Sequence, residues 1–139
     1  MNKKLKISIK KSLKGILNSL PMIFSIILLV SLVDILIPSE TIKLLFSGGF
    51  IDTIIGAGIG SVAAGNPITS YIIGGELLKQ GISLVAITAF LVAWVTVGIV
   101  QLPAEIVLLG KKFAIVRNIS NFVFSIIVAI ITVTVVNII

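Results

Sequence analysis

The chain has 139 residues, of which 58% are hydrophobic and 12% charged, against about 25% charged in an average soluble domain. This balance excludes a soluble globular domain and predicts an integral membrane protein with one domain. The chain has no Cys and no His, which excludes disulfides, thiolate chemistry and imidazole metal sites, and we expect neither a cofactor nor a bound metal.

The net charge of +6 is concentrated at the amino end, where six lysines precede residue 15. A basic start followed by apolar sequence indicates contact with anionic lipid rather than nucleic acid. We expect residues 1–14 to form a basic interfacial segment and residues 15–139 a single transmembrane domain. Ile16–Ile37 is long enough for a first full span, because about 22 helical residues reach roughly 33 Å, and Pro38 ends it.

The next two apolar segments, Phe50–Ala64 and Ile68–Lys79, are each shorter than the span of about 20 residues that a membrane requires. Gly65-Asn66-Pro67 separates them, and Pro67 fits the first turn of a new helix. We expect a broken-helix, re-entrant-like hairpin, which either dips into the membrane or crosses it twice. Backbone groups at such a break survive in lipid only where they face protein or a polar cavity, so the break is the first candidate site.

Two more spans are expected, Ile82–Leu102, which Pro103 interrupts, and Phe122–Ile139, with a basic loop at residues 111–117 between them. The fold class is therefore all-α, a polytopic membrane protein with three full spans plus the hairpin. If the hairpin returns to its starting side, nine of the eleven basic residues share one face, and only Lys43 and Lys79 lie opposite. This charge bias predicts a multi-pass plasma-membrane protein with a cytoplasmic N-terminus.

Small residues at Gly56, Gly60 and Ala64 lie four apart and form a smooth helix face. Such a face lets another helix approach closely, and we expect it to be the packing and oligomer face. Residues 58–63 also match the dinucleotide pattern G-x-G-x-x-A, but that pattern requires a strand, a helix and a soluble βαβ unit, so close packing is favoured.

Polar residues at the two breaks are the candidate substrate contacts. At the first break, the helix beginning at Pro67 suits an anion, although Asn66 also fits an ordinary cap. At the second, Glu105 is either a proton or cation carrier or a solvated interfacial group, so the charge of the substrate stays open. The full set is Gly65, Asn66, Pro67, Thr69, Ser70, Thr96, Gln101, Pro103 and Glu105. The sequence has no nucleophile motif and no acid pair at useful spacing, so we expect no enzyme activity.

Several stretches resemble one half of the predicted permeases related to the organoarsenical efflux permeases. The resemblance rests on LVDILIPSETIKLLFSG (Leu32–Gly48) and on residues 65–129, which include KQGIS after the first break, TAF, QLP and LGKKFAIVR (Leu109–Arg117). Known members have eight or more spans in two related halves, so the resemblance implies a half-size transporter. Many members carry cysteines at the first break. Their absence here favours hard cations, oxyanions or small polar metabolites.

These patterns predict a half-transporter that moves a small polar solute or ion through a cavity lined by broken helices. The alternative is a non-transporting membrane scaffold or accessory subunit. The expected partners are the lipid membrane, the solute, and a second copy of the chain or a homologous half. A parallel homodimer or a distinct inverted partner is favoured over an antiparallel homodimer, because inversion of one copy would place its nine basic residues on the wrong side.

Overall fold

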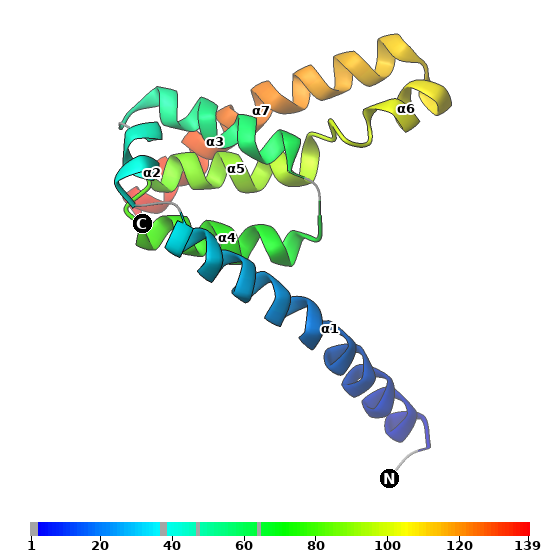
Figure 1. Cartoon of the computed structure of the whole chain (residues 1–139). Coiled ribbons are helices and arrows are strands. Elements are labelled where there is room, and N and C mark those ends of the chain that lie inside the picture. Colours follow the sequence, from blue (N-terminus) through cyan, green and yellow to red (C-terminus); the bar gives the residue numbers. More distant parts are fainter. Residues whose placement is uncertain (1–2, 37–38, 47, 64) are drawn as a thin grey trace. The chain divides into compact units, whose positions relative to one another are not determined.

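The computed structural model describes residues 3–36, 39–46, 48–63 and 65–139, and all regular structure in these ranges is helical (Figure 1). The chain divides into two compact units, Met1–Leu36 and Ile37–Ile139, which are described separately. The helices are α1 (Lys3–Leu36), α2 (Ser39–Leu45), α3 (Phe50–Val62), α4 (Pro67–Lys79), α5 (Leu84–Thr96), α6 (Leu102–Leu109) and α7 (Lys111–Ile138).

Helix α1 is the first unit and runs without interruption for 34 residues. It continues through Pro21, where the Ser25 hydroxyl donates a hydrogen bond to the Pro21 carbonyl at 2.8 Å. The predicted boundary at residue 14 therefore falls inside one helix and is not marked by a change of secondary structure. Residues 37 and 38, at the expected end of the first span, lie outside the described residues.

In the second unit, α3 and α5 run parallel and touch backbone to backbone. Gly56 lies against Ala86 and Gly60 against Phe90, so a step of four residues on one helix matches a step of four on the other. A Cβ atom added at Gly56 would lie 3.0 Å from the Ala86 carbonyl carbon, closer than the 3.5–4.0 Å at which carbon atoms pack best. Only glycine permits this approach.

This contact corrects the oligomer assignment of the small-residue face. Gly56 and Gly60 do form a close-packing surface, but α5 of the same chain covers it. Ala64, the third predicted member, lies outside the described residues. The parallel arrangement explains the difference, because α4 carries the chain back and returns α5 to the glycine face of α3.

Helices α4 and α7 both run antiparallel to α5. Gly74 of α4 faces Ile87 and Leu91, while Gly65, just before α4, lies at the Trp94 end of α5. Helix α7 passes Thr96 at Asn121 and continues toward the start of α5. The core where α3, α5 and α7 meet is built from alanines that are 0% exposed, namely Ala57, Ala89, Ala93 and Ala129.

The prediction of one long span over Ile82–Leu102 is wrong. Helix α5 has 13 residues and ends at Thr96, and the next residue, Val97, is extended (φ −96°, ψ 120°). The break lies upstream of Pro103, which sits in the first turn of α6. The predicted basic loop at residues 111–117 is also wrong, because α7 begins at Lys111 directly after Gly110, whose φ of 90° turns the chain.

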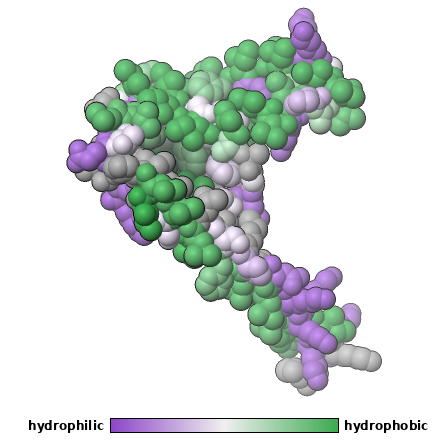
Figure 2. Space-filling model, in the orientation of Figure 1, coloured by the Kyte–Doolittle hydropathy of each residue, from purple (hydrophilic) through white to green (hydrophobic). Residues whose placement is uncertain are grey.

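Within the described residues, α7 is the one helix long and apolar enough to cross a membrane. In the most apolar stretch of 18 residues in α7, only 17% is buried, whereas the core helix of a soluble protein would be mostly buried. Figure 2 shows hydrophobic residues over most of the visible face of this unit and hydrophilic residues at the tip where α6 meets α7. A largely exposed apolar helix of this kind is compatible with contact with lipid.

Candidate functional site

The first break follows α3, where Ala63 is extended (φ −68°, ψ 131°), and ends at the start of α4. The Asn66 side-chain oxygen accepts a hydrogen bond from the Ile68 N–H at 2.9 Å, and Pro67 occupies the first turn of α4. The capping prediction for Asn66 and Pro67 is confirmed. Gly65, Asn66 and Pro67 are exposed, so the cap leaves their outer faces available.

The other predicted contacts at this break are partly occupied within the chain. The Ser70 hydroxyl donates to the Pro67 carbonyl at 2.7 Å, and Ser70 is 1% exposed. Thr69 is half-buried. The Trp94 indole N–H donates to the Gly65 carbonyl at 3.3 Å, which ties this break to the end of α5.

The second break, Val97–Gln101, is organised by Asn118 of α7. The Asn118 side-chain oxygen accepts a hydrogen bond from the Gly98 N–H at 2.9 Å. Its amide group donates to the Ala114 carbonyl at 3.0 Å and to the Glu105 carboxylate at 3.2 Å. Because Asn118 takes the Gly98 N–H, that group is not available to extend α5 by another turn.

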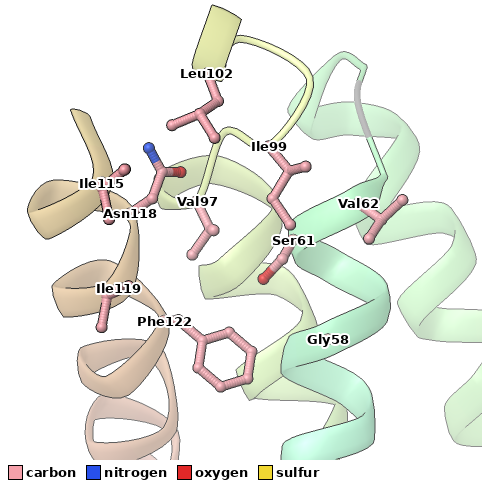
Figure 3. A pocket seen from close by; sticks show the side chains of 10 residues that line it. All are labelled: Gly58, Ser61, Val62, Val97, Ile99, Leu102, Ile115, Asn118, Ile119 and Phe122. Carbon is pink, nitrogen blue, oxygen red and sulfur yellow. The ribbon is translucent and has the colours of Figure 1, made fainter. Parts of the chain in front are cut away.

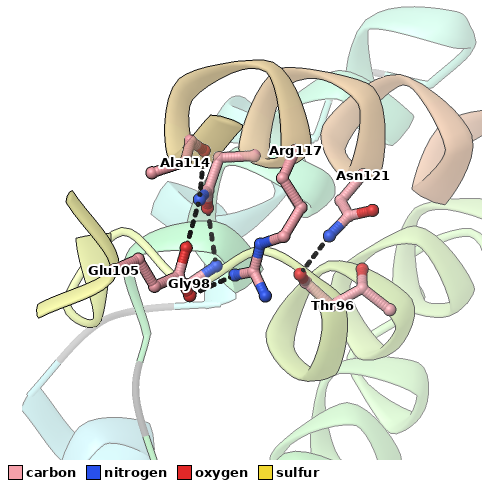
Figure 4. Close-up of polar contacts among 7 residues, drawn as sticks. Thr96, Gly98, Glu105, Ala114, Arg117 and Asn121 are labelled. Carbon is pink, nitrogen blue, oxygen red and sulfur yellow. Dashed lines mark hydrogen bonds and ion pairs between the residues drawn. The ribbon is translucent and has the colours of Figure 1, made fainter. Parts of the chain in front are cut away.

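Glu105 and Arg117 form an ion pair beside this break (Figure 4). The Glu105 side chain is 12% exposed and the Arg117 side chain 34% exposed, so the pair is partly withdrawn from water. Nε of Arg117 is buried and has no hydrogen-bond partner in the described part of the chain. The pair joins α6 to α7, and so it holds the start of α6, which follows the break, against α7.

The remaining predicted contacts at the second break are exposed or form hydrogen bonds within the chain. The Thr96 hydroxyl donates to the Val92 carbonyl at 2.8 Å, while the Thr96 carbonyl accepts from the Asn121 amide at 2.7 Å. Gln101 and Pro103 are exposed. The Glu105 N–H donates to the Gln101 carbonyl at 3.1 Å, which starts α6.

A cavity of about 460 Å³ lies between the end of α3, the second break and α7 (Figure 3). Its lining is almost entirely apolar, and none of the predicted substrate contacts belongs to it. This cavity is therefore not the polar cavity that was predicted to lie between the two breaks. The lining residues are Gly58, Ser61, Val62, Val97, Ile99, Leu102, Ile115, Asn118, Ile119 and Phe122.

Sequence reasoning did not single out Asn118 or Asp52. Asp52 of α3 is 2% exposed, and one carboxylate oxygen accepts from the Gly48 N–H at 2.8 Å. Its other oxygen is buried and has no partner among the described residues. The place of Asp52 in the first turn of a helix is a signal that the sequence offers, whereas no local sequence pattern marks Asn118. The described residues contain no group of three or more acidic side chains that could hold a metal ion.

Comparison of the chain with protein-family models, with curated proteins and with solved structures gives no match. The resemblance to permeases therefore stays a prediction from the sequence.

Proposed function

We propose that the chain is one half of a transporter that moves a small polar solute or ion across the membrane. The observation that carries this proposal is the pair of helix breaks. Two parallel helices in contact, α3 and α5, each end in an extended residue after 13 residues, and a polar network from α7 holds the second break. Discontinuous helices of this kind build the substrate and ion sites of many secondary transporters.

The lengths of the helices support a location of the breaks inside the membrane. Thirteen helical residues reach about 20 Å, roughly two thirds of a hydrocarbon core of about 30 Å. Helix α7 runs alongside, and with 28 residues it reaches about 42 Å, which is enough to cross completely. The chain is then a multi-pass membrane protein whose basic α6–α7 tip, residues 109–112, is cytoplasmic by the distribution of positive charge.

The chemistry at the breaks suits a polar solute. The last carbonyl groups of a helix have no partners within the helix, and two parallel helices bring two such ends together. Glu105 and Arg117 add a partly buried ion pair, and ionisable groups at membrane depth favour a functional site. Carbonyl ends together with the Glu105 carboxylate favour a cation, whereas the start of α4 and the Arg117 guanidinium favour an anion.

A second half is part of this proposal. The cavity within the chain is apolar, and the outer faces of Asn66 and Gln101 are exposed, so a polar pathway requires another surface opposite them. A second copy or a homologous half supplies that surface. The predicted substrate contacts at residues 65–70 and 96–105 then form one wall of the pathway.

A ligand screen tests this function. The purified chain is heated in detergent with individual small anions and hard cations, and a ligand present at about 100 times its Kd stabilises it by about 2.7 kcal/mol. We expect the stabilisation to be lost in Asn66→Ala and kept in Ser83→Ala. Ser83 is the matched control, because it caps α5 through the Ala86 N–H at 3.3 Å, at the helix end away from the break. Equal stabilisation of both variants would remove the first break from the site.

A membrane scaffold is the second candidate, and one observation favours it. The cavity is apolar, and the side chains of Ser70, Thr96 and Asn118 form hydrogen bonds within their own chain. A scaffold requires the packed α3–α5 core but no polar pathway. Replacing both Asn66 and Gln101 by leucine separates the two functions, because a scaffold keeps its assembly and its cellular phenotype while a transporter loses solute movement.

A further inference from the structure

One stripe of α7 joins the apolar cavity to the basic α6–α7 tip. Ile115, Ile119 and Phe122 line the cavity, and Lys111 precedes Ile115 by four residues, so it lies on the same face of the helix. The step along the axis is about 6 Å, and side chains on a helix lean toward its N-terminus, which directs Lys111 away from the cavity and toward the tip. Lys111 and Lys112 both also line a separate depression with Phe113 and Val116. Lys112 is one residue further along α7, so it does not share the face of Ile115 and Ile119.

The polar side chains that line the cavity have no unused hydrogen-bond donor to offer a polar ligand. The Ser61 hydroxyl donates to the Ala57 carbonyl at 2.7 Å, and both amide hydrogens of Asn118 are taken by Ala114 and Glu105. A bound water needs two to four polar partners, which this lining does not supply. The volume of about 460 Å³ lies within the range of small-molecule sites. The occupant that fits is apolar.

We propose that this cavity holds an acyl chain of an anionic phospholipid whose headgroup phosphate lies against Lys111. An apolar slot with a cation about one helical turn beyond its end matches a lipid with a charged head, and basic groups at the cytoplasmic surface attract anionic lipids. The site requires only that α7 lies in the membrane, and it is independent of transport. It assigns α7 two tasks, because the same helix supports the second break through Asn118.

Native mass spectrometry of the full chain tests the proposal. The protein is equilibrated in detergent with equal amounts of phosphatidylglycerol and phosphatidylcholine that have identical acyl chains. We expect one retained lipid, with phosphatidylglycerol preferred. Lys111→Gln is expected to lower that preference about fivefold, the effect of one lysine near a charged surface, while binding of phosphatidylcholine is unchanged. Lys112→Gln is the matched control and keeps the preference.

Filling the cavity tests the acyl half of the site. A Cβ at Gly58 meets nothing within 4 Å, so Gly58→Leu extends into the cavity without a backbone clash, and we expect it to displace both lipids. Gly75→Leu, on α4 and also in open space, is the control and keeps them. Ile119→Phe fills the same space from α7 in case Gly58→Leu does not fold. Three results would each overturn the proposal. The first is unchanged lipid retention in both filled variants, and the second is an equal effect of Lys111→Gln and Lys112→Gln on the lipid preference. The third is a change of oligomeric mass in the filled variants without loss of lipid.

Discussion

The close contact between α3 and α5 makes a quantitative prediction about Gly60. A Cβ atom placed there would overlap the Phe90 carbonyl oxygen and lie 3.1 Å from the Phe90 carbonyl carbon and Cα. These are backbone atoms, so no side-chain rotation relieves the overlap. In Gly60→Ala the two helices have to separate, which loosens the alanine core formed by Ala57, Ala89 and Ala93.

Gly58→Ala isolates the cost of this contact. Gly58 is on the same helix, two residues earlier, and an added Cβ meets nothing within 4 Å. Both substitutions gain the same helix propensity, about 1 kcal/mol, because alanine replaces glycine inside a helix. The difference between the two variants is therefore the overpacking cost, which we expect to be about 1–3 kcal/mol against Gly60→Ala.

The assay is equilibrium unfolding in mixed micelles at two protein concentrations at least tenfold apart. Because the contact lies within one chain, the deficit of Gly60→Ala is expected to be the same at both concentrations. A deficit that shrinks as the protein is concentrated would assign Gly60 to an interface between chains. Equal stability of Gly58→Ala and Gly60→Ala would refute the close approach of α3 and α5.

Three further predictions concern the breaks. Arg117→Gln is expected to lower the unfolding free energy by about 1–3 kcal/mol, and by more than Glu105→Gln does. The reason is that Arg117→Gln leaves a carboxylate that is 12% exposed, whereas Glu105→Gln leaves a guanidinium that reaches water. The reverse order in chemical unfolding would contradict this. Asn118→Leu removes the acceptor for the Gly98 N–H, and faster hydrogen exchange at Gly98 than in the parent is expected. Asn66→Ala is expected to cost about 1 kcal/mol through the lost cap, and unchanged exchange in the first turn of α4 would refute the cap.

The first break could be predicted from the sequence because its cause is local. Asn66 caps α4 through a group two residues away, and Pro67 excludes continuation of the preceding helix. The second break was misplaced because its cause is distant. The Gly98 N–H is taken by Asn118, twenty residues along the chain, and no local pattern shows that contact. Pro103, the visible breaker, begins a helix instead of ending one.

The small-residue face also shows that the sequence predicts a kind of contact but not the partner that makes it. Glycines four residues apart predict that another helix comes close, and at Gly56 and Gly60 one does. The spacing does not identify that helix, because α5 of the same chain and a helix of a second chain offer the same kind of surface. The pairing depends on α4 reversing the chain, which follows from tertiary structure.

Cysteine accessibility in native membranes tests the central claim most directly, because the chain has no cysteine of its own. Single cysteines are placed at Asn66 and Gln101 on the breaks, at Ile130 on the apolar part of α7, and at Lys112 on the tip. We predict that the two break positions react with a small charged thiol reagent but not with a bulky maleimide, that Ile130→Cys reacts with neither, and that Lys112→Cys reacts with both. Break positions as inert as Ile130→Cys, or as open to the bulky reagent as Lys112→Cys, would contradict a polar pathway inside the membrane.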